Sequence, residues 1–533
     1  MKKIPPLLFS ISLFVDMVLG LEASTLVYAF EGSLQDSSFY SPNLSQEMPY
    51  RIYLPPDYSD AETESTRYPV LYLLHGHEDE ENYLAHTYWT ERTQIATLAD
   101  SYGMIIVFPE GLRSWYTNYY NSEPGMNRFE DYIIHDVIDH VDETYRTRPD
   151  RESRAIMGNS MGGNGALKLA ARHSDRFCAA ASMSGVLDLS IIGVASFLEP
   201  VFPNNLRTVF GPYPANLLYY EGNSAAALAP NFVNREAPGR SHTLIHFDAG
   251  LFDHYFAQVW ALEYARVLDD LGLAYDADIF GGDSESAGHT WTYWGNHIEE
   301  VLEFISKAFK TPPARPRRWC YRSVEPSFEV WGWSARILRS PRWVWVEMVD
   351  VDKHGFDFKD DGTTSALSVE TPLLYVPGAS FKIVVSDSFG ETLSETRGTA
   401  DSRGSLQFEV DFAGARLDRS AKDEDLIVQD PTSEGPQKGR PSVAPGEEFQ
   451  GYRNAEKNWV RTVHVQILEE AVPEGGASSC GGCAYAPAGR SSDSACSTAQ
   501  LLADLAPFLM PVGWLAILLR RHRQARHSIC KKA

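Results

Sequence analysis

The chain has 533 residues, of which 44% are hydrophobic, 22% charged and 12% aromatic. These values are typical of a globular protein with ample apolar material for a core, and they exclude disorder over the whole chain. Its 47 basic residues face 71 acidic ones, for a formal charge of -24, and this sign argues against a nucleic-acid binder, which needs a basic surface.

The first 24 residues have the layout of a secretory signal peptide. Lys2 and Lys3 form a basic start, and an apolar stretch from Leu7 to Leu19 follows, broken once by Asp16. This layout is typical of export signals, and the stretch is too short to span a membrane comfortably. We therefore predict a signal peptide over residues 1–24, with an uncleaved N-terminal anchor as the alternative.

Residues 25–311 alternate apolar runs with stretches of helical periodicity. Four runs read as buried strands: Tyr68–Leu74, Met104–Phe108, Ala155–Met157 and Thr243–Phe247. Two stretches between them have helical spacing: Asn127–Tyr145 and Ala166–His173. Strands that are apolar throughout, with helices between them, indicate a mostly parallel sheet covered on both faces. The pattern predicts an α/β domain over residues 25–311.

The strongest chemical motif is Gly-Asn-Ser-Met-Gly at residues 158–162. It fits the pattern G-x-S-x-G, and it lies between a predicted strand and a predicted helix. In that context the serine sits on a sharp turn, with its hydroxyl exposed beside a helix N-terminus that favours negative charge. Ser160 is therefore our candidate nucleophile. The alternative is a glycine-rich turn whose serine takes no part in catalysis.

A serine nucleophile needs a general base, and the base needs a carboxylate to orient it. In this fold class the chain order is serine, acid, histidine, so both partners are expected downstream of the motif. We predict His289, in a glycine-bounded loop, as the base and Asp253 as the orienting acid. Asp248 is the competing acid, although it could instead bond backbone amides at the end of its strand. Two histidines compete as bases but fit structural or exposed roles better: His246 and His297.

Acyl transfer also requires N–H donors for the oxyanion. We expect one from Met161, the residue after the nucleophile, and one from His77, in the loop after an early strand. An aromatic cluster fits a sugar or phenolic pocket and a structural core equally well: Trp115, Tyr116, Tyr119 and Tyr120. We name Trp115 and Tyr116 as the predicted substrate-binding residues. The chemistry requires no metal and no organic cofactor.

The pattern changes after a Pro/Arg-rich linker at residues 312–318. Short strand-like runs separated by turns predict a small β-sandwich over residues 319–471, with a mobile loop at about 419–456. Four tryptophans raise the hypothesis that this region binds carbohydrate, although alternating tryptophans in strands are usually core: Trp331, Trp333, Trp343 and Trp345.

The C-terminal part resembles the three-part sorting signals of bacterial surface proteins. Residues 472–499 are small and polar and include Cys480 and Cys483, while residues 500–533 contain an apolar stretch followed by arginines. This composition predicts a transmembrane helix with a cytoplasmic basic tail. The resemblance implies a membrane-bound sorting protease as partner, with either cysteine as a processing or lipid-attachment site; a plain C-terminal anchor is the alternative.

Five motifs occur in an order that resembles the esterase-D-like branch of the α/β-hydrolases: Leu-His-Gly at 74–76, Pro-Glu-Gly-Leu-Arg-Ser-Trp-Tyr at 109–116, Gly-Asn-Ser-Met-Gly-Gly at 158–163, Gly-Leu-Phe-Asp at 250–253 and Gly-His-Thr-Trp at 288–291. That branch includes feruloyl and acetylxylan esterases, S-formylglutathione hydrolases and mycolyltransferases. The resemblance implies an α/β-hydrolase fold and favours Asp253 over Asp248. Two features depart from it, the acidic approach to His289 at residues 283–287 and the whole of residues 319–471.

These observations predict an exported serine esterase, periplasmic or held at the surface or outer membrane of a bacterium, acting on a small-molecule or carbohydrate ester. An acyltransferase with a lipid or sugar acceptor is the first alternative. A surface binding protein with a degenerate hydrolase domain is the second, and the complete serine, acid and histidine order argues against it.

Overall fold

The computed structural model describes residues 30–78, 84–189, 202–237, 239–339, 343–417 and 461–470. The predicted signal peptide, the loop at 419–456, the small polar stretch and the C-terminal helix with its basic tail lie outside the described residues. Within these ranges, no helix combines the length and the apolar character needed to cross a membrane.

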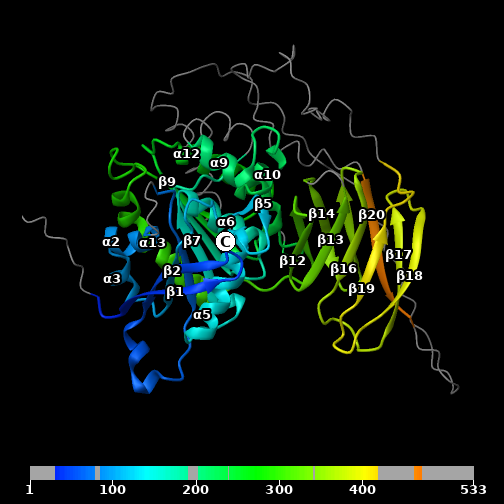
Figure 1. Cartoon of the computed structure of the whole chain (residues 1–533), viewed down its shortest axis with the longest axis horizontal. Coiled ribbons are helices and arrows are strands. Elements are labelled where there is room, and N and C mark those ends of the chain that lie inside the picture. The colour runs from blue at the N-terminus through cyan, green and yellow to red at the C-terminus, as the bar shows by residue number, and fades with distance from the viewer. Residues whose placement is uncertain are drawn as a thin grey trace, which may run out of the picture. The chain divides into compact units, whose positions relative to one another are not determined.

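The α/β region is built on one eight-stranded sheet with the order β1-β2-β4-β3-β7-β8-β9-β10 (Figure 1). The strand bounds are β1 Ser33–Ser41, β2 Gln46–Leu54, β3 Val70–Leu74, β4 Ile105–Pro109, β7 Arg154–Asn159, β8 Ala179–Met183, β9 Leu244–Gly250 and β10 Asp276–Phe280. The strands from β4 to β10 are parallel, and β2 and β1 add antiparallel strands at one edge. The predicted mostly parallel sheet is confirmed.

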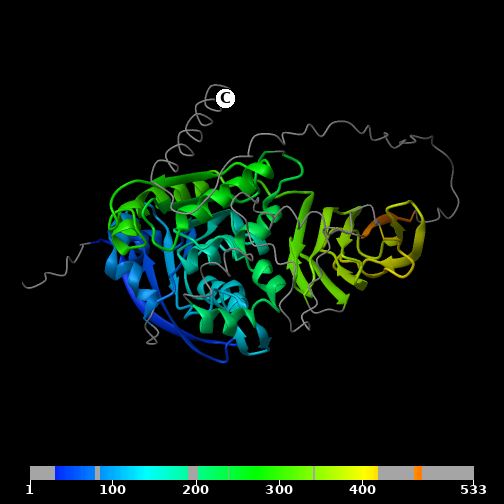
Figure 2. The ribbon, with the colours of Figure 1, turned by 90° about the horizontal axis from the view of Figure 1, so that it is seen from above.

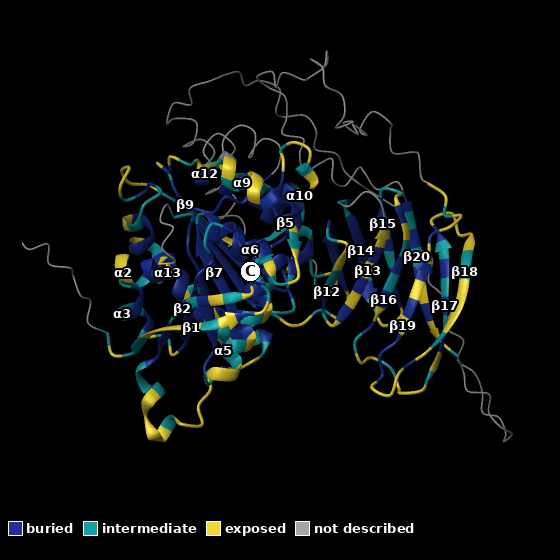
Figure 3. Ribbon diagram, viewed as in Figure 1, coloured by how far each residue is buried: buried dark blue, intermediate teal, exposed yellow. Residues whose placement is uncertain are grey.

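Helices lie on both sides of this sheet (Figure 2). Their bounds are α2 Tyr88–Arg92, α3 Ile95–Ala99, α4 Phe129–Asp131, α5 Ile138–Thr144, α6 Met161–Arg172, α9 Pro203–Phe210, α10 Leu217–Gly222, α11 Ala225–Leu228, α12 Ala257–Asp270 and α13 Trp291–Lys310. Apolar residues of α2, α3 and α13 share one buried cluster with alternate residues of the central strands. Strands β3, β4, β7 and β8 are buried along their whole length (Figure 3), and for this reason β3 and β4 read as continuous apolar runs.

The β-rich region consists of two antiparallel sheets. One has the order β11-β14-β15-β20-β17-β18 and the other β12-β13-β16-β19. The bounds are β11 Trp319–Ser323, β12 Ser327–Val330, β13 Trp333–Arg339, β14 Val346–Asp352, β15 Gly355–Asp360, β16 Thr364–Glu370, β17 Ser380–Asp387, β18 Thr392–Thr399, β19 Gln407–Asp411 and β20 Arg461–Glu469. Buried residues from both sheets form one apolar cluster, which confirms a β-rich region that follows the α/β region.

All described residues belong to one compact unit, and buried contacts join the two regions. Asn231 bonds both backbone groups of Arg322, accepting at 2.7 Å and donating at 3.0 Å. Trp343 stacks on Tyr219 of α10 with ring centroids 4.2 Å apart. Strand β14 begins at Val346, three residues after Trp343.

Candidate active site

Ser160 occupies a strained turn between β7 and α6. Its backbone angles are φ 54° and ψ -118°, a conformation that residues with side chains rarely adopt. A Cβ added at Gly158 would lie 2.5 Å from the Gly162 carbonyl oxygen, and one at Gly162 would lie 2.5 Å from the His75 oxygen. Only glycine fits at both places, so the motif closes a tight turn. Ser160 itself stays half-buried, whereas Asn159 and Met161 are fully buried.

The loop after β3 passes directly beside this turn. A Cβ added at Gly76 would lie 3.3 Å from the Ser160 Cβ. Two side chains donate to carbonyls at the start of the loop, Trp89 to Leu74 at 3.2 Å and Tyr116 to His75 at 3.0 Å. His77 follows at once and is half-buried. The backbone around the predicted oxyanion donor is therefore held close to the serine.

A buried charge cluster supports the same loop. Glu110, at the end of β4, lies 3.1 Å from His75 Nε2 and 3.0 Å from His86 Nδ1. Burial works against charge on His75 and Glu110, but the attraction between them is stronger. It raises the pKa of His75 and lowers the pKa of Glu110 well below its usual range. The sequence does not indicate this cluster, because its members come from three separate segments.

Asp253 and His289 form the closest acid–histidine pair of the site. Asp253 is 2% exposed, and its Oδ2 accepts a 2.7 Å hydrogen bond from His289 Nδ1. Its other oxygen accepts from the Tyr255 amide at 2.8 Å. A carboxylate bonded on both oxygens is fixed in orientation, and it fixes the imidazole in turn.

The two loops that carry this pair are tied to each other. A Cβ at Gly250 would lie 2.1 Å from the Ala287 oxygen, and the Phe252 amide donates to that same oxygen at 2.9 Å. The acidic approach to the histidine folds on itself, because Asp283 accepts from the Ser286 amide at 2.8 Å. The chain segment that departs from the family pattern thus forms a local turn before His289.

Asp248 has a different set of partners. The Tyr293 hydroxyl donates to it at 2.6 Å, and His246 Nε2 lies 3.3 Å away. Burial opposes charge on His246, but hydrogen bonds to Asp248 and Asp276 outweigh it and raise its pKa to about 9. Asp248 and His246 therefore form a structural ion pair. The remaining competitor, His297, stacks on Phe280 with ring centroids 3.7 Å apart.

The predicted pocket residues Trp115 and Tyr116 are 1% and 0% exposed. The Trp115 ring N–H donates to Asn205 at 2.8 Å, and the Tyr116 hydroxyl donates to the backbone oxygen of His75, in the loop after β3. A fully buried phenol lies in the core, which is the alternative left open for this cluster. Trp115 keeps a ring contact with His77, at 6.4 Å between centroids.

Aromatic rings connect the loop after β3, which carries His77, to the loop that carries His289. His77 packs on Phe202 at 4.5 Å, Phe202 on Tyr255 at 6.2 Å, and Tyr255 on His289 at 4.7 Å. We did not predict Phe202 or Tyr255 as site residues. Tyr255 lies two residues after the predicted acid Asp253, and this closeness in sequence could have pointed to it. Nothing in the sequence around Phe202 indicates a place in the site.

This chain is similar to several known esterases. A family described as "Putative esterase" matches residues 41–305. Esterase Rv1288 of Mycobacterium tuberculosis is 34% identical over 139 residues, 26% of this chain and 29% of that protein. Acetyl esterase of Caldicellulosiruptor saccharolyticus is 24% identical over 282 residues, 52% of this chain and 98% of that protein. The chain thus spans less than a third of the first relative and nearly all of the second.

A solved structure of a ferulic acid esterase is 25% identical; the match covers 53% of this chain and all of that chain, with a TM-score of 0.40. Independently of that likeness, the sheet order and the turn after β7 are those of an α/β-hydrolase. Residues 41–305 therefore resemble the "Putative esterase" family and have the α/β-hydrolase fold.

Proposed function

We propose that this protein is a serine carboxylesterase with Ser160 as nucleophile, His289 as base and Asp253 as the orienting acid. The observation that carries the proposal is the buried 2.7 Å hydrogen bond between His289 and Asp253. The serine, the acid and the histidine follow β7, β9 and β10, which are parallel strands of one sheet. Residues that follow the carboxyl ends of such strands gather at one edge, where sites of this fold class lie.

The chemistry follows from the groups present. His289 donates through Nδ1 to Asp253, which leaves Nε2 to take the Ser160 proton as Oγ attacks the ester carbonyl. The amides of Met161 and His77 stabilise the oxyanion; loss of one such donor in a comparable site costs about 3 kcal/mol. The imidazolium then protonates the departing alcohol. Water attacks the acyl-enzyme with the histidine as base, which releases the acid and restores the serine.

The substrate is proposed to be an acylated carbohydrate. The acetyl esterase relative, which this chain covers almost completely, supports a short acyl group. The ring series from His77 through Phe202 and Tyr255 to His289 supports an aromatic or sugar ring at the site. The proposed place of action is outside the cytoplasm, on the basis of the composition of residues 1–24 and 500–533.

The test is hydrolysis by full-length protein and a Ser160→Ala variant of p-nitrophenyl acetate, acetylated xylan and methyl ferulate. Ser184→Ala is the matched control: Ser184 follows the next strand, is fully buried and also has a positive φ. We expect turnover to fall by a factor of about 10⁴ or more in the Ser160 variant and to persist in the control. Added alcohol acceptors distinguish transfer from hydrolysis.

A folded protein that hydrolyses none of these esters contradicts the esterase proposal. Transfer to added alcohol that exceeds hydrolysis moves the assignment to an acyltransferase with the same three residues. Equal turnover by the Ser160→Ala variant removes Ser160 from the mechanism.

A further inference from the structure

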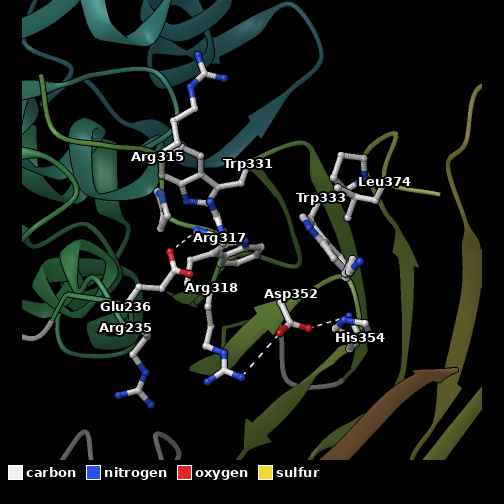
Figure 4. A pocket seen from close by; sticks show the side chains of 14 residues that line it. Arg235, Glu236, Arg315, Arg317, Arg318, Trp331, Trp333, Asp352, His354 and Leu374 are labelled. Atoms are coloured by element: carbon white, nitrogen blue, oxygen red, sulfur yellow. Dashed lines mark hydrogen bonds and ion pairs between the residues drawn. The ribbon is translucent and has the colours of Figure 1, made fainter. Parts of the chain in front are cut away.

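A cavity whose lining contains none of the predicted triad residues lies where the linker joins the two regions. Its volume is about 720 Å³, within the range of small-ligand sites. Its walls come from the α/β region, the linker and the β-rich region (Figure 4). The residues used below are Arg235, Glu236, Arg315, Arg317, Arg318, Trp331, Asp352 and Lys353.

The cavity is basic although the protein is acidic. Five of its lining residues are arginine or lysine and two are acidic, in a chain of formal charge -24. Such a local excess of positive charge attracts an anion and concentrates it at the cavity.

The basic side chains of the cavity differ in whether they form ion pairs. Arg235 pairs with Asp350 at 3.1 Å, and Arg315 pairs with Glu152 at 2.8 Å. Arg318 reaches the cavity's own Asp352 at 3.8 Å. For Arg317 and Lys353 the described part of the chain offers no carboxylate within 4.0 Å, and both are exposed. These two cations are therefore available to a ligand.

Hydrogen bonds fix the linker backbone that carries Arg317. Pro313 accepts from Arg151 at 3.2 Å, and the Arg317 amide donates to Glu236 at 2.8 Å. Because the backbone is tied on both sides of Arg315, residues 313–318 form a fixed wall of the cavity. A site that is already ordered loses less entropy when it binds.

Trp331 provides a half-buried aromatic surface beside the cations. Its φ is 53°, a strained value for a large side chain, and the Arg151 guanidinium lies 5.3 Å from its ring centroid. The His242 and Trp331 rings form a T-shaped pair with ring centroids 5.4 Å apart. Strain in a bulky residue persists only where the surroundings fix it. The ring is therefore immobilised as one side of the cavity.

We propose that this cavity binds a uronic-acid saccharide, with its carboxylate at Arg317 and Lys353 and a sugar ring against Trp331. Two carboxylates line the same space, Glu236 and Asp352. They would repel a doubly charged phosphate or a polyphosphate more strongly than a single carboxylate, and they accept hydrogen bonds from sugar hydroxyls. The mixture of cations, acceptors and an aromatic ring therefore fits an acidic sugar better than a simple anion. The inference does not rest on the esterase proposal.

Binding is tested by calorimetric titration of full-length Ser160→Ala protein with oligogalacturonate, with neutral xylohexaose and with inorganic phosphate. The variant pair Arg317→Gln/Lys353→Gln removes the two available cations from exposed positions. Arg403→Gln removes an exposed arginine of the β-rich region that does not line the cavity. We expect the pair to weaken oligogalacturonate binding about tenfold or more and the control less than about twofold.

The proposal is overturned if xylohexaose or phosphate binds as tightly as oligogalacturonate, or if the Arg317/Lys353 variant binds like the parent. Unchanged circular dichroism separates lost contacts from lost folding. Protein that keeps Ser160 and carries Arg317→Gln and Lys353→Gln should hydrolyse p-nitrophenyl acetate as fast as the parent. Failure of this site and failure of the esterase assignment therefore give different results.

Discussion

The α/β region and the β-rich region differ in which residues adopt a positive φ. Among the described residues, the α/β region places eight non-glycine residues there: Ser45, Leu112, Trp115, Tyr116, Asn127, Ser160, Ser184 and Phe256. The β-rich region meets this need mostly with glycine: Gly332, Gly355, Gly362, Gly378, Gly390, Gly404 and Gly414. Its non-glycine cases are Trp331, which lines the basic cavity, and Asp350, which pairs with Arg235.

The difference indicates where side chains are needed in spite of strain. A turn that only reverses the chain takes glycine, which adopts positive φ without steric cost. Six of the eight strained residues of the α/β region follow the carboxyl ends of β4, β7, β8 and β9, the edge that bears the proposed catalytic groups. Strain that persists in a residue with a side chain thus marks both candidate sites of this protein.

The largest expected effect separates the two acids of this edge. Asp253→Asn would present an amide N–H to His289 Nδ1 and favour the wrong tautomer, so kcat should fall about 10⁴-fold. Asp248→Asn keeps a carbonyl oxygen for Tyr293 and should change kcat less than about tenfold, at a cost of about 1 to 3 kcal/mol in stability. Steady-state kinetics and urea unfolding measure both. The reverse ranking of kcat would exchange the roles of the two residues.

Glycines of the two regions should also respond differently to a methyl group. Gly162→Ala brings Cβ to 2.5 Å and 2.7 Å from the buried backbone oxygens of His75 and Leu74. We expect a loss of about 3 kcal/mol in stability, because backbone atoms cannot move aside. Gly390→Ala meets no atom within 4 Å and only forces φ 83° on alanine, so about 1 kcal/mol is expected. Equal losses in thermal unfolding would contradict the difference.

The histidine ion pairs of the two regions predict different responses to pH. The pKa of buried His246 is raised to about 9. Its stabilisation is therefore complete below about pH 6.5 and is lost as the pH rises through 9, by about 1 to 3 kcal/mol. His464 is also paired with an aspartate, but its side chain is 38% exposed, and such pairs contribute little. The difference in unfolding free energy between pH 6 and pH 9.5, measured with urea, should disappear in His246→Gln and persist in His464→Gln.

The smallest effect concerns the strain at Ser160 itself. Both Ser160→Ala and Ser160→Gly remove the hydroxyl, but only glycine relieves φ 54°. The glycine variant should be more stable than the alanine variant by about 1 kcal/mol, since relief of strain exceeds the entropy cost of glycine. Thermal unfolding of the two inactive proteins decides this. A less stable glycine variant would show that the turn is not strained.

The residues that sequence reasoning identified are those with local signals. Ser160 is flanked by glycines between a strand and a helix, and the structure has that turn there. β8 was missed because Ala-Ala-Ala-Ser-Met has high helix propensity. It is a strand because α6 packs closely on it: a Cβ at Gly163 would lie 2.5 Å from Ser182 Oγ. That contact selects small residues, and it is not visible in the sequence.

Contacts between residues that lie far apart in the chain could not be predicted from the sequence either. The cluster joins Glu110 to His75 and His86, which lie 35 and 24 residues earlier in the chain, and no periodicity connects them. The burial of Tyr116 depends on the distant loop to which its hydroxyl donates. The sequence left this aromatic cluster open between a pocket and a core, and in the structure Tyr116 is fully buried.

The place of β20 has a consequence for how the chain is made. It is the last described strand in the chain, yet it pairs with β15 on one side and β17 on the other. The five other strands of its sheet leave the ribosome first, and two of them keep open edges until Arg461–Glu469 emerges. Open edges invite pairing with other chains. A chain that terminates before residue 461 therefore leaves the edges of β15 and β17 exposed to chaperones and proteases, whereas a chain that includes β20 covers them.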